Sequence, residues 1–216
     1  GACVQELQHG GGWELWVQSV SFSPDGARVA SGGRDGRVKV WACATGACVQ
    51  EVEHGDDWVR SVSFSPDGAR VASGGEDGRV KVWACATGAC VQELQHGGDY
   101  VMVTTVLFSP DGSQLAAHDE YYRKQWKAWD VATGEPVVPV PDTAAWPRTA
   151  SGAAAAAFAV SADGAAAVTV RPVGAADADA DTLRFSPAET VQSKKEAHVI
   201  PGGTIVVWRP TILWRR

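Results

Sequence analysis

A near-perfect internal repeat is the feature that most constrains the fold of this chain. Ser19–Glu51 reads SVSFSPDGARVASGGRDGRVKVWACATGACVQE, and Ser61–Glu93 repeats it 42 residues later with one difference in 33 positions, Arg34 against Glu76. A third and more divergent copy, Val106–Gly134, follows. At this period the 216 residues hold about five units, so we expect stacked copies of one supersecondary structure.

Each unit has the pattern of short β-strands. Val20 and Phe22 alternate with serines, and alternation bounded by turn residues is typical of a strand. Ser23-Pro24-Asp25-Gly26 has the residues of a type I turn, and further reversals are expected at Gly32–Gly36 and Ala44–Gly46. We therefore predict four antiparallel strands per unit, here called a to d, and an all-β protein.

The period, the four strands, the FSPDG motif and the Trp that closes the third strand together resemble the WD40 repeat family of β-propellers. The Trp-Asp dipeptide of that family occurs once, at Trp129-Asp130. The resemblance implies one WD40-type β-propeller domain over residues 1–216, with about five four-stranded blades and a degenerate fourth blade. It also implies an incomplete ring, or a fragment of a larger chain. The near-identical tandem copies resemble the repeat arrays of fungal and bacterial signalling receptors.

The sequence divides into three parts within this domain. Residues 1–140 carry well-formed repeats, residues 144–181 are rich in alanine and degenerate, and residues 182–208 form a last partial blade. By the family's topology, Ala2–Gln8 supplies the outer strand of that last blade, beside Thr204–Trp208. We expect Trp41 and Trp83 to be essential for stability, and Trp146, in irregular sequence, to contribute little.

Ser, His and Asp recur in each unit and raise the possibility of a catalytic triad. The resemblance implies instead a buried hydrogen-bond network that ends on the Trp indole N–H, which needs an acceptor when buried. The family usually has Gly-His before strand a, whereas here the order is His9-Gly10 and His54-Gly55. A shift of one residue turns a side chain to the opposite face of a strand, so one alternative is that the histidine misses the network and leaves only the contacts among Ser, Asp and Trp. The residues of the predicted network are Ser31, Asp35, Trp41, Ser73, Asp77, Trp83 and His54.

Charge and cysteine content restrict the partners. The net charge of −6 argues against nucleic acid, and the longest uncharged apolar run, residues 153–160, is too short to span a membrane. Five cysteines favour reduced thiols in the cytoplasm, although a Cys43–Cys48 disulfide across a turn is conceivable. Cys48 and His54 lie too far apart along a strand to share zinc. We expect no metal and no cofactor.

The loops that differ between otherwise matching units are the predicted binding surface. In the family's topology the d–a and b–c loops emerge on one face, and Arg34 and Glu76, in b–c turns, are expected to point to solvent. Exposed aromatics among charges are typical of protein-binding hot spots. The candidate partner-binding residues are Trp13, Trp16, Arg34, Asp56, Asp57, Trp58, Glu76, Tyr100 and Met102.

These observations predict a non-enzymatic scaffold that presents a rigid face to a protein or peptide. One alternative is a propeller-type hydrolase with a site in the central channel, although the inner strands WVQSVSF and WVRSVSF place no acid there. A second alternative is a purely structural role in assembly, with self-association through open blade edges.

Overall fold

The computed structural model describes residues 5–10, 17–97, 101–119, 124–146, 150–151, 158–160, 167–171, 181–185 and 204–208. Nearly all regular structure in these ranges is β-strand, as predicted, and the exception is a 3-10 turn at Thr143–Ala145. No described helix has the length and apolarity needed to cross a bilayer.

Two complete blades stand where the repeat predicted them. Each is a four-stranded antiparallel meander, because the strands alternate apolar and polar residues and tight turns with positive-φ glycines, such as Gly26 and Gly36, join them. The first blade comprises β2 (Val17–Phe22), β3 (Arg28–Gly33), β4 (Arg37–Ala42) and β5 (Cys48–Glu53). The second comprises β6 (Val59–Phe64), β7 (Arg70–Gly75), β8 (Arg79–Ala84) and β9 (Cys90–Gln95).

The third blade has three strands and a remnant of the fourth. Its strands are β10 (Thr105–Phe108), β11 (Gln114–His118) and β12 (Trp126–Asp130). Beyond them, Pro136 makes an isolated bridge opposite Trp129, and the Val137 N–H donates to the Ala128 carbonyl at 2.8 Å. Prolines at 136, 139 and 141 lack the N–H that a longer outer strand would need.

The remaining strands form one mixed sheet rather than a stub and a separate last blade. Its order is β1-β16-β17-β15-β14, so the described residues hold four sheets where about five blades were expected. The N-terminal strand joins the last sheet as predicted, but it pairs mainly with β16 and touches β17 only at Glu6 opposite Val206. The strands are β1 (Gln5–Gly10), β14 (Phe158–Val160), β15 (Ala167–Arg171), β16 (Asp181–Phe185) and β17 (Thr204–Trp208).

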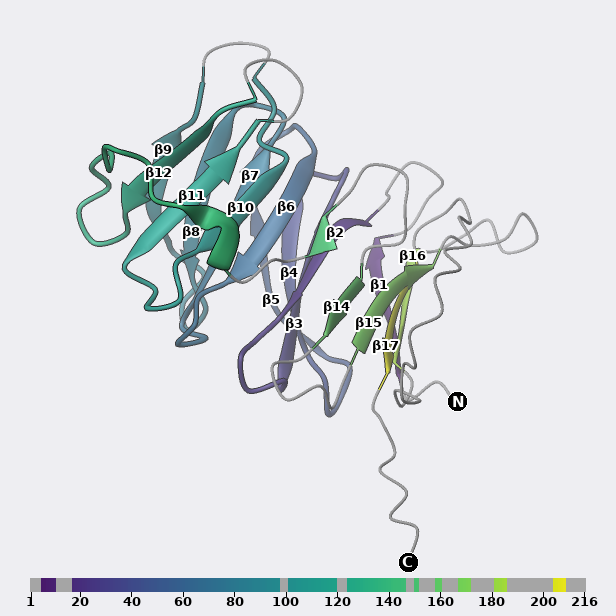
Figure 1. Ribbon diagram of the computed structural model, residues 1–216. Helices are drawn as coiled ribbons and strands as arrows, with labels where there is room; N and C mark the ends of the chain where they lie inside the picture. Colours follow the sequence, from purple (N-terminus) through teal and green to yellow (C-terminus); the bar gives the residue numbers. More distant parts are fainter. Residues whose placement is uncertain are drawn as a thin grey trace, which may run out of the picture.

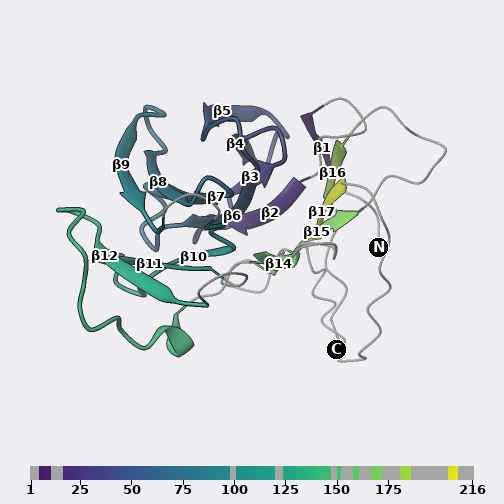
Figure 2. The same cartoon turned by 90° about the horizontal axis from the view of Figure 1, so that it is seen from above.

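The sheets stand side by side in a row. The third blade and the mixed sheet lie at opposite ends, with the two complete blades between them (Figures 1 and 2). A two-residue strand, β13 (Ala150–Ser151), pairs with β2 on the edge opposite β3.

Successive blades are joined by apolar contacts and by serine hydroxyls. The Val62 N–H donates to Ser19 Oγ at 3.1 Å, and the Phe64 N–H donates to Ser21 Oγ at 3.2 Å. Gly32 lies so close to the next blade that a Cβ there would approach a Val59 methyl to 2.5 Å. The inner strands therefore hold neighbouring blades together, and glycine is needed where they approach most closely.

Candidate functional site

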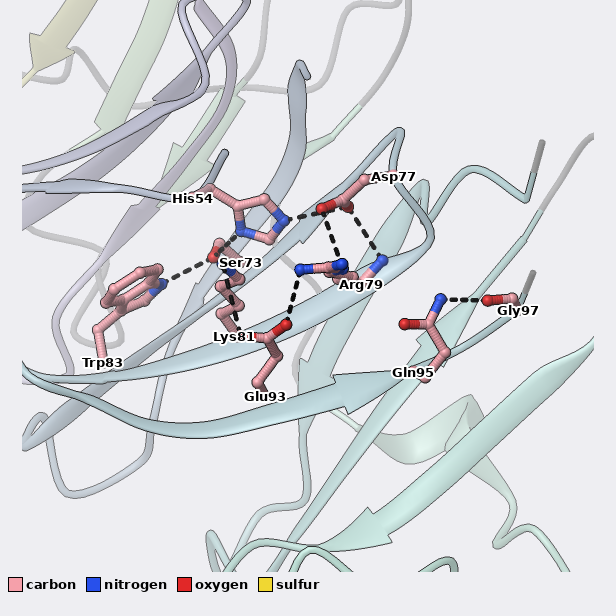
Figure 3. Close-up of polar contacts among 9 residues, drawn as sticks. All are labelled: His54, Ser73, Asp77, Arg79, Lys81, Trp83, Glu93, Gln95 and Gly97. Carbon is pink, nitrogen blue, oxygen red and sulfur yellow. Dashed lines mark hydrogen bonds and ion pairs between the residues drawn. The ribbon is translucent and has the colours of Figure 1, made fainter. Parts of the chain in front are cut away.

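A buried chain of four polar side chains links strands of neighbouring sheets. In the second blade the Trp83 Nε1–H donates to Ser73 Oγ at 2.8 Å, and Ser73 Oγ lies 2.7 Å from His54 Nδ1 (Figure 3). His54 Nε2 lies 3.4 Å from the carboxylate of Asp77. The first blade repeats these contacts with Trp41, Ser31, His9 and Asp35, the histidine coming from β1 of the mixed sheet.

One arrangement of protons satisfies every atom of this chain. A neutral His54 protonated on Nε2 donates to Asp77 and accepts the Ser73 hydroxyl proton on Nδ1, while the Ser73 oxygen accepts the Trp83 indole proton. Protonation of both ring nitrogens would leave the serine hydroxyl without this acceptor. The order Asp–His–Ser is that of a catalytic triad, but the serine side chain is fully buried and its oxygen is occupied by the indole.

His54 is part of the network, as the resemblance implied, and the alternative in which the histidine misses it is wrong. His54 follows the end of β5, and its backbone N–H donates to the Gly36 carbonyl at 2.8 Å, which fixes the ring above Ser73. The strand alternation used in the prediction does not pass through residues 55–58, because β6 begins only at Val59. Without the histidine the aspartate would not be connected to the serine at all.

The aspartates of the network have a lowered pKa. Burial raises the pKa of Asp77, but the hydrogen bonds from His54 and from the Arg79 backbone N–H, together with the charge of Arg79, outweigh that effect and lower the pKa. Asp35 shows the same balance with His9. Both carboxylates are therefore held in the ionised form that accepts the histidine proton.

The third blade lacks part of the network. Ala117 occupies the position of Ser73, so His96 Nε2 contacts the Ala117 backbone carbonyl at 3.1 Å and His96 Nδ1 is buried with no hydrogen-bond partner. Burial accordingly lowers the pKa of His96. The predicted network is thus complete in two blades and incomplete in the third, which agrees with the greater sequence divergence of the third copy.

The b–c turns and the d–a connections lie together, as the resemblance implied. The His54 and His96 N–H groups donate to the Gly36 and Gly78 carbonyls, and the Glu76 N–H donates to the Trp58 carbonyl at 3.0 Å. The d–a connection at residues 54–58 is thus bonded at its start to the b–c turn of the first blade and at its end to the b–c turn of the second. We call the surface formed by residues 33–36, 54–58, 75–78 and 101–103 the loop face.

Trp58, on the loop face, contacts two arginines. The Arg34 guanidinium carbon lies 3.8 Å from the ring centroid of Trp58, and that of Arg60 lies 4.9 Å away. Arg60 also donates through Nε to Glu76 at 2.7 Å, and both side chains of that pair are largely buried. Cation–π contacts and a shielded ion pair thus make this a packed cluster.

The prediction that Arg34 and Glu76 point to solvent is therefore wrong. Their difference has an internal explanation, because strand a carries Gln18 in the first blade where the second blade carries Arg60. Glutamate at 76 pairs with Arg60, whereas arginine at 34 stacks on Trp58 of the next blade. The residue that sequence reasoning missed is Arg60, and its signal was the Gln18-to-Arg60 change beside the repeat.

The other candidate residues have separate places. Asp56 and Asp57 are exposed on the loop face, and Met102 is half-buried beside the buried Val101 and Val103. Trp13, Trp16 and Tyr100 lie outside the described residues.

The cysteines carry no disulfide among the described residues. Cys43, Cys48, Cys85 and Cys90 are free, and burial raises the pKa of the last three thiols. Within the same ranges, no three His, Cys, Asp or Glu side chains gather as a metal ion would require.

Comparison with known proteins agrees with the repeat pattern. Residues 1–42 and 46–84 match the family described as "WD domain, G-beta repeat". These two matches support the resemblance to WD40 repeats in the part of the chain that holds β1 and most of the two complete blades.

Among curated proteins, the chain is similar to two proteins named ribosome biogenesis protein BOP1 homolog. The one from Drosophila virilis is 43% identical over 53 residues, and the one from Drosophila grimshawi is 42% identical over 53 residues. The matched segment covers 24% of this chain and 7% of each relative, so the likeness is confined to a small part of those proteins.

Proposed function

We propose that this chain is a non-enzymatic interaction module that binds a protein or peptide through the loop face. The observation that carries the proposal is the cluster of mutually contacting side chains Arg34, Trp58, Arg60 and Glu76, next to exposed Asp56 and Asp57. A surface already ordered before binding loses little side-chain entropy on association. The partly exposed Trp58 then provides an aromatic contact for a partner, and the carboxylates of Asp56 and Asp57 favour a partner with positive charge at this place.

The structure gives less support to a hydrolase in the central channel. The innermost strand of the first blade is buried along its length, and β13 occupies its free edge. Ser31 and Ser73, which have the neighbours of a triad serine, are closed to substrate and bonded to indoles. WD40 repeats generally serve as protein-binding scaffolds, which is the role proposed here.

We also propose a cytoplasmic role in signalling, because the tandem repeats resemble those of signalling receptors and the described cysteines are free thiols. The BOP1 homologues are ribosome biogenesis proteins by name, but the 53 matched residues give no specific reason to place this chain in that process. The acidic net charge favours a protein partner over nucleic acid.

A charge reversal tests the binding surface. Tagged full-length chain, as wild type and as Asp56→Lys, is used to recover partners from the source cell, and the recovered proteins are quantified by mass spectrometry. The matched control is Glu135→Lys, an exposed acid in the c–d turn of the third blade, away from the loop face. We expect wild type and Glu135→Lys to recover the same partners and Asp56→Lys to lose them. Equal recovery by all three would contradict the proposal.

A further inference from the structure

Trp146 is buried against the last blade of the array although it lies in irregular sequence. Only 7% of its surface is exposed, and it packs with Leu107, Ala116 and Ala128 on one face of the third blade. The expectation that Trp146 contributes little is therefore at odds with its position. Asp142 accepts from the Ala144 N–H at 2.9 Å, and the Trp146 N–H donates to the Thr143 carbonyl, so the 3-10 turn presents the indole to the sheet.

Trp146 covers the face of the third blade that is equivalent to the face with which the first blade packs against the second. In the first blade Ala30, Val38 and Val40 pack against Val62 and Phe64 of the second. Strand register makes Ala116 equivalent to Ala30, Trp126 to Val38 and Ala128 to Val40. Trp146 therefore occupies the place that a following blade takes elsewhere.

Two substitutions adapt the third repeat to this contact. Leu107 stands at the position of Ser21, whose hydroxyl accepts a backbone N–H from the next blade. The leucine cannot accept that hydrogen bond, but it packs on the Trp146 ring in the same apolar cluster. Ala128 stands where the repeat has valine, which leaves room for an indole.

The chain just after Trp146 also covers the inner edge of the first blade, where β13 pairs with β2. In β6 the N–H groups of Val62 and Phe64 are satisfied by serines of the preceding blade. In β2 the equivalent edge is paired instead with β13, in which Ala150 lies opposite Val20. Trp146 and Ala150 are four residues apart in sequence, yet they contact the third and the first blade.

We propose that residues 142–146 together with β13 (Ala150–Ser151) form a terminal cap that ends the blade array after its third blade. Trp146 covers the surface of the third blade on which a fourth blade would pack, and β13 pairs with the inner edge of the first blade. Ring closure through the third blade is thereby blocked, and the apolar face that would cause a second copy to stack is withheld from solvent. Binding partners are left with the loop face.

Two variants of the full-length chain test the cap. Trp146→Ala removes the indole, and we expect a lower Tm and an apparent mass that rises with protein concentration in light scattering. Val138→Ala is the control, because this apolar residue of the same connection is 87% exposed. An unchanged Tm together with an unchanged mass for Trp146→Ala would overturn the cap.

The second variant keeps the proposal testable even where Trp146→Ala fails to fold. Ala128→Val restores the repeat residue and adds two methyl groups beneath the indole. If Trp146 fills that space, crowding should lower Tm by about 2–10 °C. If Trp146 does not fill that space and the face is open to pack against another blade, the valine should leave Tm unchanged or raise it. Either of those results would refute the cap.

Discussion

Removal of the Ser73 hydroxyl should lower the free energy of unfolding by several kcal/mol, because two buried polar groups depend on it. Ser73→Ala leaves the Trp83 indole N–H and His54 Nδ1 without partners in a fully buried site. Each unsatisfied buried group costs about 1–3 kcal/mol. The expected loss of unfolding free energy is therefore about 2–6 kcal/mol, which corresponds to roughly 2–4 °C in Tm for each kcal/mol in a chain of this size.

The matched control for this loss is Ser63→Ala in the same blade. Ser63 is also buried, but its hydroxyl makes only a 3.4 Å contact with the Phe64 carbonyl. Urea denaturation followed by tryptophan fluorescence measures both variants against wild type. We expect Ser63→Ala to lose about 1 kcal/mol or less. If Ser73→Ala were no more destabilised than Ser63→Ala, the network would not hold the blade, and our reasoning on the site would be refuted.

Three further predictions follow from the packing and the network. Ala117→Ser should stabilise the third blade by about 1 kcal/mol, because its hydroxyl can reach the unpartnered His96 Nδ1; an unchanged urea midpoint would contradict this. Gly74→Ala should lower Tm markedly, since a Cβ there would collide with the Val103 side chain, whereas Gly55→Ala has room and should not; equal Tm values would be the contrary result. Since burial depresses the pKa of His96, its contribution to stability is complete above about pH 6.5 and is lost as pH falls through the folded pKa; a Tm independent of pH between 7 and 5 would exclude this.

The blades could be predicted from sequence because their signals are local and repeated. Strand alternation, the Ser23–Gly26 turn and the closing Trp41 are each encoded within a few residues, and the second copy confirmed the first. The serine, aspartate and tryptophan of the network followed from the family resemblance. The orientation of His54 was left open, because it depends on a hydrogen bond to the Gly36 carbonyl rather than on strand parity.

Contacts between residues that are distant in the sequence could not be predicted from the sequence. Arg60 pairs with Glu76 across a sheet, and Arg34 stacks on Trp58 across a blade boundary, so a charge difference that resembled partner selection reflects internal packing. Trp146 carries no local pattern at all. Its burial follows from three residues of the third blade that are unremarkable until they are placed on one face.

Hydrogen exchange of the tryptophan indoles tests the central claim, that the two complete blades are locked by identical buried networks. Proton–nitrogen NMR of the full chain in deuterated buffer follows the indole N–H of Trp41 and Trp83, assigned with Trp41→Phe and Trp83→Phe variants. Because both protons are buried and bonded to serine oxygens, we predict that the two indoles exchange far more slowly than exposed tryptophan. Exchange of both at the rate of exposed tryptophan would contradict the account.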